Sequence, residues 1–441
     1  MHSRSMRRHR LTLLMAIMLA VSTLFPIETL AKKIPTPIAK ENWKVSLNGG
    51  ALFEPIVQKD GSLLVGSYQK VDGKYKAEIL SLSRTGKKSG KWKLTAEKIE
   101  LGGTSTTPTI LALNYSKGKI TGYNPKGKKL WTHKIGQELR DHEVDEKGNI
   151  YVKSTKGTLY KISTKGKQQF KLEAREGEFH IFGGSVYHLY SSGINTTVTM
   201  YTDKGKVRYQ IHPLTEEDNE ANLVNVSLIG SGNHAFMKAT YWDGATEDIY
   251  HILSVFDENG KRIRTVKMGG ELVNKVFEYK NDSIFLDTRY YYKMNAKGKL
   301  IKKTKMPSMD DTTIKHAMMT DNGEVYVERG KKLFKFNANG SIAWYKSISG
   351  SLMNGLVMNG KIYVNNYNAE GKRDRTDGYV TVLDSKGNVI SKISVARHIF
   401  GEYGETFITG DLKRKTIYIT NHRFDYKKDD FSKMVITSVK Q

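Results

Sequence analysis

Histidines and carboxylates are the side chains of this chain best suited to bind a metal or to transfer protons. The histidines are scattered, and none is paired with another at the i, i+4 helical spacing of a zinc site. The acidic run at 216–220 offers the clustered oxygen atoms that calcium prefers, yet it lacks the alternating spacing and the glycine of a known calcium loop. Acidic residues do not recur as pairs at equivalent positions of the repeat described below. The sequence therefore predicts no catalytic residue, no metal and no cofactor.

Three stretches are longer than the turns around them: residues 212–223, 241–248 and 365–378. They combine tyrosine and tryptophan with arginine, a mixture that is enriched in contact surfaces. Loops on a rigid scaffold often carry binding residues. We therefore expect a surface for a protein or glycan partner there, although loop length alone is equally consistent with neutral variation. The candidate contact residues are Tyr241, Trp242, Asp243, Tyr367, Lys372, Arg373 and Arg375.

A glycine turn before a β-type strand recurs along the chain. From Gly86 to Gly387 there are 301 residues and seven steps, so the mean period is 43 residues. The clearest unit, residues 144–172, holds short strands rich in valine, isoleucine and tyrosine, joined by glycine turns that need a positive φ. A period of about 40–45 residues with four strands per unit is typical of a β-propeller. The recurring glycines are Gly86, Gly127, Gly166, Gly205, Gly260, Gly298, Gly340 and Gly387.

The two ends of the chain complete one another in this repeat. Residues 43–47 look like a fourth strand without its first three, and residues 406–439 supply three strands without a fourth. Pairing 43–47 with 433–439 closes the ring and removes its open edge. We therefore predict an all-β fold, a single β-propeller of four-stranded antiparallel blades. We expect eight blades; the literal repeat count allows nine, and the weak first strand at 104–107, beside Pro108, is where the two counts diverge.

Several units share a motif in which a polar glycine turn leads into a strand with an aromatic residue. It is present at residues 145–170, at 124–131 (NPKGKKLW) and at 337–344 (NANGSIAW). This motif resembles the pyrroloquinoline-quinone-type (PQQ-like) propeller repeat, and the resemblance covers most of residues 43–439. In that family the aromatic residue packs between adjacent blades. The position here holds Trp92, Trp131, Phe170, Tyr209 and Trp344, whereas Arg264, Ile301 or Ile390 stand near it elsewhere, so the resemblance implies that docking is only partly kept.

The resemblance implies a fold more than an activity, because the family includes dehydrogenases, outer-membrane assembly scaffolds and secreted proteins of unknown role. Its quinone-dependent enzymes use a vicinal cysteine pair over the cofactor and a calcium ion held by Glu and Asn or Asp. This chain has no cysteine. We therefore expect a secreted member without the quinoprotein active site, and not an enzyme.

The first 31 residues form a segment of their own. Four arginines precede the apolar stretch 11–27, and residues 29–31 offer a small-residue cleavage site. This is the pattern of a secretory signal peptide, with an uncleaved anchor as the alternative. We assign 1–31 to the signal, 32–42 to a linker and 43–441 to the propeller. After the signal, no stretch is long and apolar enough to predict a transmembrane segment.

The net charge of the chain is +26, and the first 31 residues contribute four arginines and one glutamate, so the remainder keeps +23. Such a charge attracts polyanions, although an evenly spread lysine coat is the alternative to a focused surface. We expect a secreted or extracellular monomer, with attachment to the cell wall as one form of this.

Two functions follow from these observations. The first is a non-catalytic binding or scaffold protein at the bacterial cell envelope or outside the cell. It would present loops on one face to an unknown protein or an anionic cell-wall polymer, with no specific nucleic-acid partner. The alternative is a hydrolase or lyase that acts on an anionic polysaccharide in the central funnel, and it requires clustered carboxylates at the funnel mouth.

Overall fold

The computed structural model describes most of the chain from residue 41 to residue 440. Outside the description lie residues 1–40, 105–106, 174–175, 193–194, 215–222, 232–233, 244–245, 247, 258, 269–275, 311–312, 349–350, 367–378, 395–405, 426–429 and 441. The described residues belong to one compact unit, Ile38–Gln441. They form strands and turns, and no helix among them could cross a membrane.

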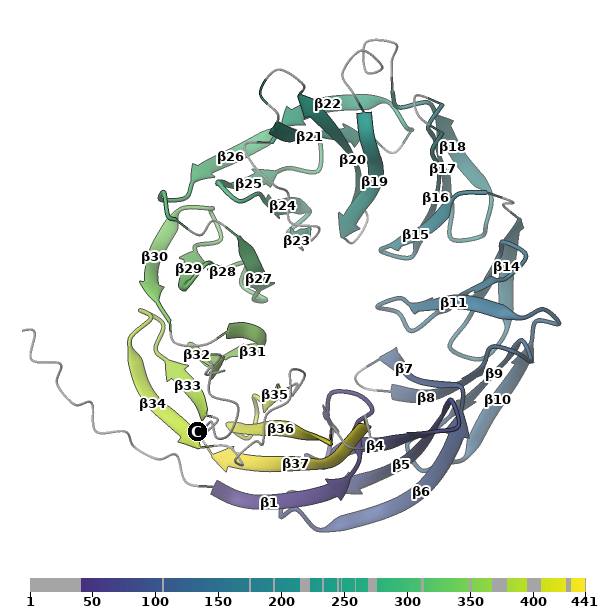
Figure 1. Ribbon diagram of the computed structural model, residues 1–441, viewed down its shortest axis with the longest axis vertical. Helices are drawn as coiled ribbons and strands as arrows, with labels where there is room; N and C mark the ends of the chain where they lie inside the picture. Colours follow the sequence, from purple (N-terminus) through teal and green to yellow (C-terminus); the bar gives the residue numbers. More distant parts are fainter. Residues whose placement is uncertain are drawn as a thin grey trace, which may run out of the picture. The chain divides into compact units, whose positions relative to one another are not determined.

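The strands pair into nine antiparallel sheets, which stand as blades around a ring (Figure 1). The first strand of each blade lies toward the centre and the last lies at the periphery. The expected all-β propeller is confirmed, but eight blades is wrong, because the literal count of nine applies. We number the blades 1 to 9 in chain order.

The strand bounds, blade by blade, are as follows. Blade 1 contains β2 (Gly50–Ala51), β3 (Ile56–Val57), β4 (Leu63–Val71), β5 (Lys74–Leu82) and β6 (Lys88–Ala96); blade 2 contains β7 (Lys98–Thr104), β8 (Thr107–Asn114), β9 (Lys119–Tyr123) and β10 (Lys129–Lys134); blade 3 contains β11 (Leu139–Val144), β12 (Ile150–Ser154), β13 (Thr158–Ile162) and β14 (Gln168–Glu173). Blade 4 contains β15 (Glu178–Phe182), β16 (Ser185–Tyr190), β17 (Thr197–Tyr201) and β18 (Val207–Ile211); blade 5 contains β19 (Leu223–Ser231), β20 (His234–Asp243), β21 (Asp248–Phe256) and β22 (Arg262–Lys267); blade 6 contains β23 (Phe277–Tyr279), β24 (Asp282–Leu286), β25 (Tyr290–Met294) and β26 (Leu300–Lys305). Blade 7 contains β27 (Ile314–Met319), β28 (Val325–Arg329), β29 (Lys332–Phe336) and β30 (Ile342–Ser347); blade 8 contains β31 (Ser351–Met358), β32 (Lys361–Asn366), β33 (Tyr379–Leu383) and β34 (Val389–Ser394); blade 9 contains β35 (Thr406–Asp411), β36 (Thr416–Asp425), β37 (Asp430–Lys440) and β1 (Glu41–Asn48).

Blade 2 is where the sequence misled the count. The expected first strand at 104–107 includes residues 105–106, which lie outside the described residues. The first strand is β7, which lies before them, ends at Thr104 and pairs Lys98 with Leu113. Pro108 stands near the start of the second strand, β8, opposite Gly103. A proline is tolerated near the start of a strand, so this blade is complete and not degraded.

Each blade buries its middle strands because a neighbouring blade covers either face. In blade 3 all five residues of β13 are buried, whereas the peripheral β14 alternates between exposed and buried positions. The described residues form nine apolar clusters, each joining two successive blades; the cluster of Tyr151, Leu159 and Phe170 with Val186, for example, joins blades 3 and 4. Burial of one such side chain contributes about 1.5–3 kcal/mol. The core is therefore a ring of inter-blade layers.

The ring closes between the two ends of the chain, as expected. β1 pairs antiparallel with β37, and the register sets Val45 opposite Ile436 and Asn48 opposite Lys433. Leu47 then packs with Leu63 of blade 1 and with Ile436 of blade 9. The outer strand of blade 9 thus joins it to blade 1, and we call this junction the seam.

A ring stacked on a glycine turn connects most blades. Trp131 of β10 lies against Gly166 in the turn before β14, and its Nε1 donates to the carbonyl oxygen of Thr164 at 2.9 Å. The same arrangement joins Trp92 to Gly127, and Trp344 to Gly387. At the seam, Trp43 lies against Gly86 and donates to the Arg84 carbonyl at 2.6 Å, so β1 repeats the contact across the closure.

Blades 5 and 6 keep this docking with different residues. Arg264 and Lys302 occupy the register position of the aromatic residue, and the neighbouring Ile263 and Tyr291 lie against Gly298 and Gly340 instead. The expectation that docking by the aromatic residue of the outer strand is only partly kept is therefore confirmed in blades 5 and 6. Another side chain lies against the glycine in each case: Ile263 on the outer strand β22 in blade 5, and Tyr291 on the neighbouring strand β25 in blade 6.

Substitution of Gly166 tests the contact. Gly166 has φ +74°, and a Cβ there would lie 2.5 Å from the Trp131 ring, whereas Gly136 has φ +75° and open space around it. Gly136→Ala should cost about 1–2 kcal/mol through backbone strain alone. Gly166→Ala should cost a further ~1–3 kcal/mol from the clash, measured as free energies of unfolding in denaturant. Equal costs would show that ring and turn are not tightly docked.

Candidate functional site: a lysine-lined cleft at the seam

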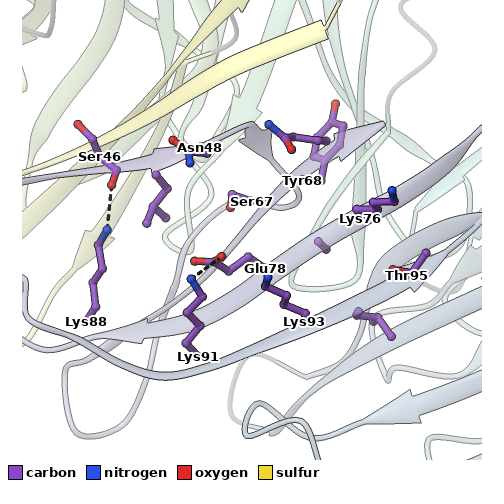
Figure 2. A pocket seen from close by; sticks show the side chains of 14 residues that line it. Ser46, Asn48, Ser67, Tyr68, Lys76, Glu78, Lys88, Lys91, Lys93 and Thr95 are labelled. Atoms are coloured by element: carbon purple, nitrogen blue, oxygen red, sulfur yellow. Dashed lines mark hydrogen bonds and ion pairs between the residues drawn. The ribbon is translucent and has the colours of Figure 1, made fainter. Parts of the chain in front are cut away.

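A cleft lies at the seam, between β1 and strands β4, β5 and β6 of blade 1 (Figure 2). Its volume is about 430 Å³. β4, β5 and β6 have nine residues each, compared with five for β12 and β13. β1 ends at Asn48, where the chain turns inward through Gly49 to β2. Residues 46–48 line the cleft beside one face of the blade 1 sheet, which is left partly open.

Strand alternation explains why this face is polar. Trp92 points toward Gly127 of blade 2, so Lys91 and Lys93, its neighbours on β6, point to the opposite side. The sheet register places Glu78 opposite Lys93, and Lys76 opposite Thr95. The full lining is Ser46, Leu47, Asn48, Ser67, Tyr68, Gln69, Lys76, Ala77, Glu78, Lys88, Lys91, Lys93, Leu94 and Thr95.

The cleft has four ammonium groups and one carboxylate. Lys91 forms an ion pair with Glu78 at 2.8 Å, and Lys88 donates from Nζ to the Ser46 carbonyl oxygen at 3.0 Å (Figure 2). Lys76 and Lys93 form no ion pair with any residue that the structure describes. Clustered lysines act as mobile point charges that attract phosphate or carboxylate groups, and the hydroxyl and amide groups around them can hydrogen-bond a polar ligand. The cleft is suited to bind an anion.

Sequence reasoning missed these lysines because it treated lysine as a solvating residue of turns. The pattern KSGKWKLT contains a usable signal, since Lys91 and Lys93 flank the docking tryptophan and must share the opposite face. The pattern does not reveal that β1 ends beside that face of the sheet. This juxtaposition brings the outer strand of blade 9 beside the strands of blade 1.

The structure places the expected contact residues in different environments. The supposed loop 241–248 is mostly a longer hairpin, because Tyr241 to Asp243 belong to β20 and Asp248 begins β21. Tyr241 is 1% exposed and stacks on Tyr250 between blades 4 and 5, so its assignment to a contact surface is corrected. Trp242 is 44% exposed beside Ile249, and its role as a contact stays a prediction. Asp243 ends β20, and Tyr367, Lys372, Arg373 and Arg375 lie outside the described residues.

A second polar cluster joins the inner strands of blades 2 and 3. Tyr115 Oη lies 2.8 Å from His142 Nδ1, and His142 Nε2 lies 3.6 Å from Glu100. Burial, followed by the charge of Asp141, raises the pKa of Tyr115 to about 12, so the phenol stays protonated at neutral pH. Burial opposes the charge of Glu100, but the hydrogen bond from His142 and the nearby Lys98 outweigh it and lower the pKa. The cluster is built to hold two blades together.

Among the described residues, no arrangement of side chains indicates a metal site. Within the described part of the chain, no three His, Asp or Glu side chains converge as a metal site would require. The acidic run at 216–220 lies outside that part.

Comparisons with known proteins identify the fold. No model of a known protein family matches the chain, and neither does any curated protein. A crystal structure described as the eukaryotic initiation factor is similar over 84% of this chain and 97% of its own, with 12% identity and a TM-score of 0.51. BamB from Moraxella catarrhalis (14% identity, 78% and 94% covered, TM-score 0.41) and apo AztD from Citrobacter koseri (11%, 76% and 99%, 0.42) are also similar. At these identities the likeness shows the fold alone. The chain is a β-propeller, and its own strand pairing gives nine blades.

Two substitutions in the β20–β21 hairpin separate a packing role from a surface role. Tyr241→Ser should destabilise the protein by about 3 kcal/mol, because it opens a cavity among buried rings. Trp242→Ser should change the free energy of unfolding by no more than about 1 kcal/mol, because the side chain is half in water. Denaturant unfolding of both variants checks this, and a larger loss for Trp242→Ser would show that it too packs in the fold.

Proposed function

We propose that this protein is a non-catalytic binding or scaffold protein of the PQQ-like propeller type, secreted to the bacterial cell envelope or beyond the cell. It binds a linear anionic polymer, such as a wall polymer with repeated phosphate or carboxylate groups. The observation that carries the proposal is the convergence of Lys76, Lys88, Lys91 and Lys93 on one cleft with a single carboxylate. The secretory pattern of the first 31 residues and the charge of the remainder support it.

The shape and chemistry of the cleft favour a polymer segment over an enclosed small molecule. The cleft is lined by β1 and β6, which are the outer strands of their blades, and Lys91 keeps 57% of its side chain exposed. Exposed charges bind through screened attraction and released counterions, and such contacts become strong only when several act together. A repeating polyanion supplies several charges on one molecule. The proposal therefore predicts binding that falls steeply with salt.

Charge removal in the cleft tests the site. The variant Lys76→Gln/Lys91→Gln/Lys93→Gln should weaken binding of residues 32–441 to poly(glycerol phosphate) about tenfold or more. It should also lower the slope of log affinity against log salt by about two, by analogy with counterion release from single strands. Titration calorimetry or fluorescence anisotropy at several salt concentrations measures both.

A matched control removes the same charge elsewhere. Lys117, Lys156 and Lys331 are exposed in turns between second and third strands, away from the cleft. Their triple glutamine variant should bind within about twofold of wild type. If both variants weaken equally, net charge and not the cleft attracts the polymer, and the proposal fails.

Export has its own test. Expression of the full chain in a bacterium should release a protein whose first residue is Lys32, detected by N-terminal sequencing of the extracellular fraction. Recovery of an intact N-terminus in the cytoplasm would contradict secretion while leaving the cleft untouched.

A further inference from the structure

The charges of the propeller are sorted by their distance from the centre. The nine peripheral strands, which the structure describes throughout, carry sixteen lysines and arginines and two glutamates. The innermost strands carry three basic and six acidic residues in their described bounds. The basic residues of the peripheral strands are Lys44, Lys88, Lys91, Lys93, Lys129, Lys134, Lys171, Arg208, Arg262, Arg264, Lys267, Lys302, Lys303, Lys305, Lys346 and Lys392.

These cations lie at the surface, and three of them, Lys44, Lys91 and Lys171, pair with a glutamate. All of them are exposed except Lys346 and Lys392, which are half-buried. The densest group after the cleft is on blades 5 and 6, where β22 and β26 hold three cations each and no acid. None of these six forms an ion pair with a carboxylate among the described residues, although Lys267 and Lys303 lie over tyrosine rings at 4.3 and 4.2 Å.

Blades 5 and 6 also differ from the repeat at an informative position. Arg264 and Lys302 stand where most of the other outer strands place the aromatic residue that docks on the next blade; β34 has Ser391 there. Docking there is taken over by Ile263 and Tyr291. Arg264 is thus free of the docking role, and Lys302 contributes only its aliphatic stem beside Gly340. The two positive charges are not needed to hold the blades together.

We propose that the peripheral strands form a basic belt that binds one long linear polyanion along the circumference of the ring. The seam cleft is one contact on this path, and β22 and β26 are another. The inference rests on the proposed function for the class of ligand and adds the path that it follows. A polyanion laid across the central opening would instead meet the acidic inner strands and be repelled.

Each blade presents its outer strand at the rim, so a flexible polymer meets cations repeatedly as it passes from blade to blade (Figure 1). Linked contacts of this kind raise the affinity for a long chain far above that for a short one. Affinity should therefore grow with polymer length well beyond the length that fills the cleft.

The test is a variant of blades 5 and 6, distant in sequence from the cleft. It carries Arg262→Gln, Arg264→Gln, Lys267→Gln, Lys302→Gln, Lys303→Gln and Lys305→Gln, and glutamine keeps the Lys302 stem that packs near Gly340. The control removes six exposed turn lysines outside the peripheral strands, namely Lys59, Lys117, Lys147, Lys156, Lys331 and Lys413. Unfolding midpoints of both variants are compared with wild type first.

Binding is measured with long poly(glycerol phosphate), with a short oligomer of the same unit, and with polygalacturonate to distinguish phosphate from carboxylate backbones. The blade 5–6 variant should bind the long polymer at least tenfold more weakly than the control variant does, and should bind the short oligomer as wild type does. The cleft variant should lose affinity for both.

The outcomes separate the two proposals. If the blade 5–6 variant keeps full affinity for the long polymer while the cleft variant loses it, the belt is wrong and the cleft stands. If the blade 5–6 variant loses affinity and the cleft variant does not, the belt stands without the cleft. Equal losses in the blade 5–6 variant and its control would overturn the belt and show a nonspecific response to charge.

Discussion

The contact between a ring on one blade and a glycine turn on the next is the constraint on which this propeller depends. It works only where the turn residue has no Cβ, because the added atom would lie within 3 Å of the ring at Gly86, Gly127, Gly166 and Gly387. The same turns need a positive φ, so glycine satisfies two requirements at once. The indole Nε1 of Trp43, Trp92, Trp131 or Trp344 then adds a hydrogen bond to a backbone carbonyl in the turn. These tryptophans thereby fix blade 9 to blade 1, blade 1 to blade 2, blade 2 to blade 3 and blade 7 to blade 8 through their outer strands, and Tyr279 of the inner strand β23 makes a similar contact with Gly323.

The seam follows from applying this constraint to a chain with two ends. β1 comes first in the sequence but completes the last blade, and Trp43 makes the same contact on Gly86 that the other tryptophans make within the chain. After Asn48 the chain must turn inward at once to begin blade 1. Its residues 46–48 therefore line a cleft against the long outer strands of blade 1. The cleft is a consequence of closure, and lysines occupy the face that closure leaves open.

The fold could be predicted well because its determinants are local. Glycine turns, strand alternation and the period of 43 residues are visible without any knowledge of distant contacts. The blade number was misjudged where a local signal misled, since Pro108 suggested a broken first strand and is instead tolerated at the start of the second. Tyr241 was misjudged because a long hairpin and a loop look alike in sequence, and the register of β20 decides that its ring points inward.

The cleft could not be predicted because it depends on where two strands end in space. Lys76 and Lys91 are 15 residues apart on different strands, and residues 46–48 reach them only after the ring has closed. The replacement contacts in blades 5 and 6 could not be predicted for a related reason. Ile263 on β22 and Tyr291 on β25 lie against the glycine turns, and no periodic pattern marks which side chain near a turn will make the contact.

Lysines on peripheral strands also have a simpler use, because a charged edge discourages pairing with the edge of another molecule. That use accounts for a cation on each strand, and β1, β14, β18, β30 and β34 carry one apiece. It does not account for three cations on each of β6, β22 and β26, or for the aromatic position given to Arg264 and Lys302. Edge protection needs one charge for each exposed edge and is indifferent to which blade has more. A path for a ligand requires more cations on some of the equivalent outer strands than on others. This unequal number of cations is the part of the charge pattern that the fold alone leaves unexplained.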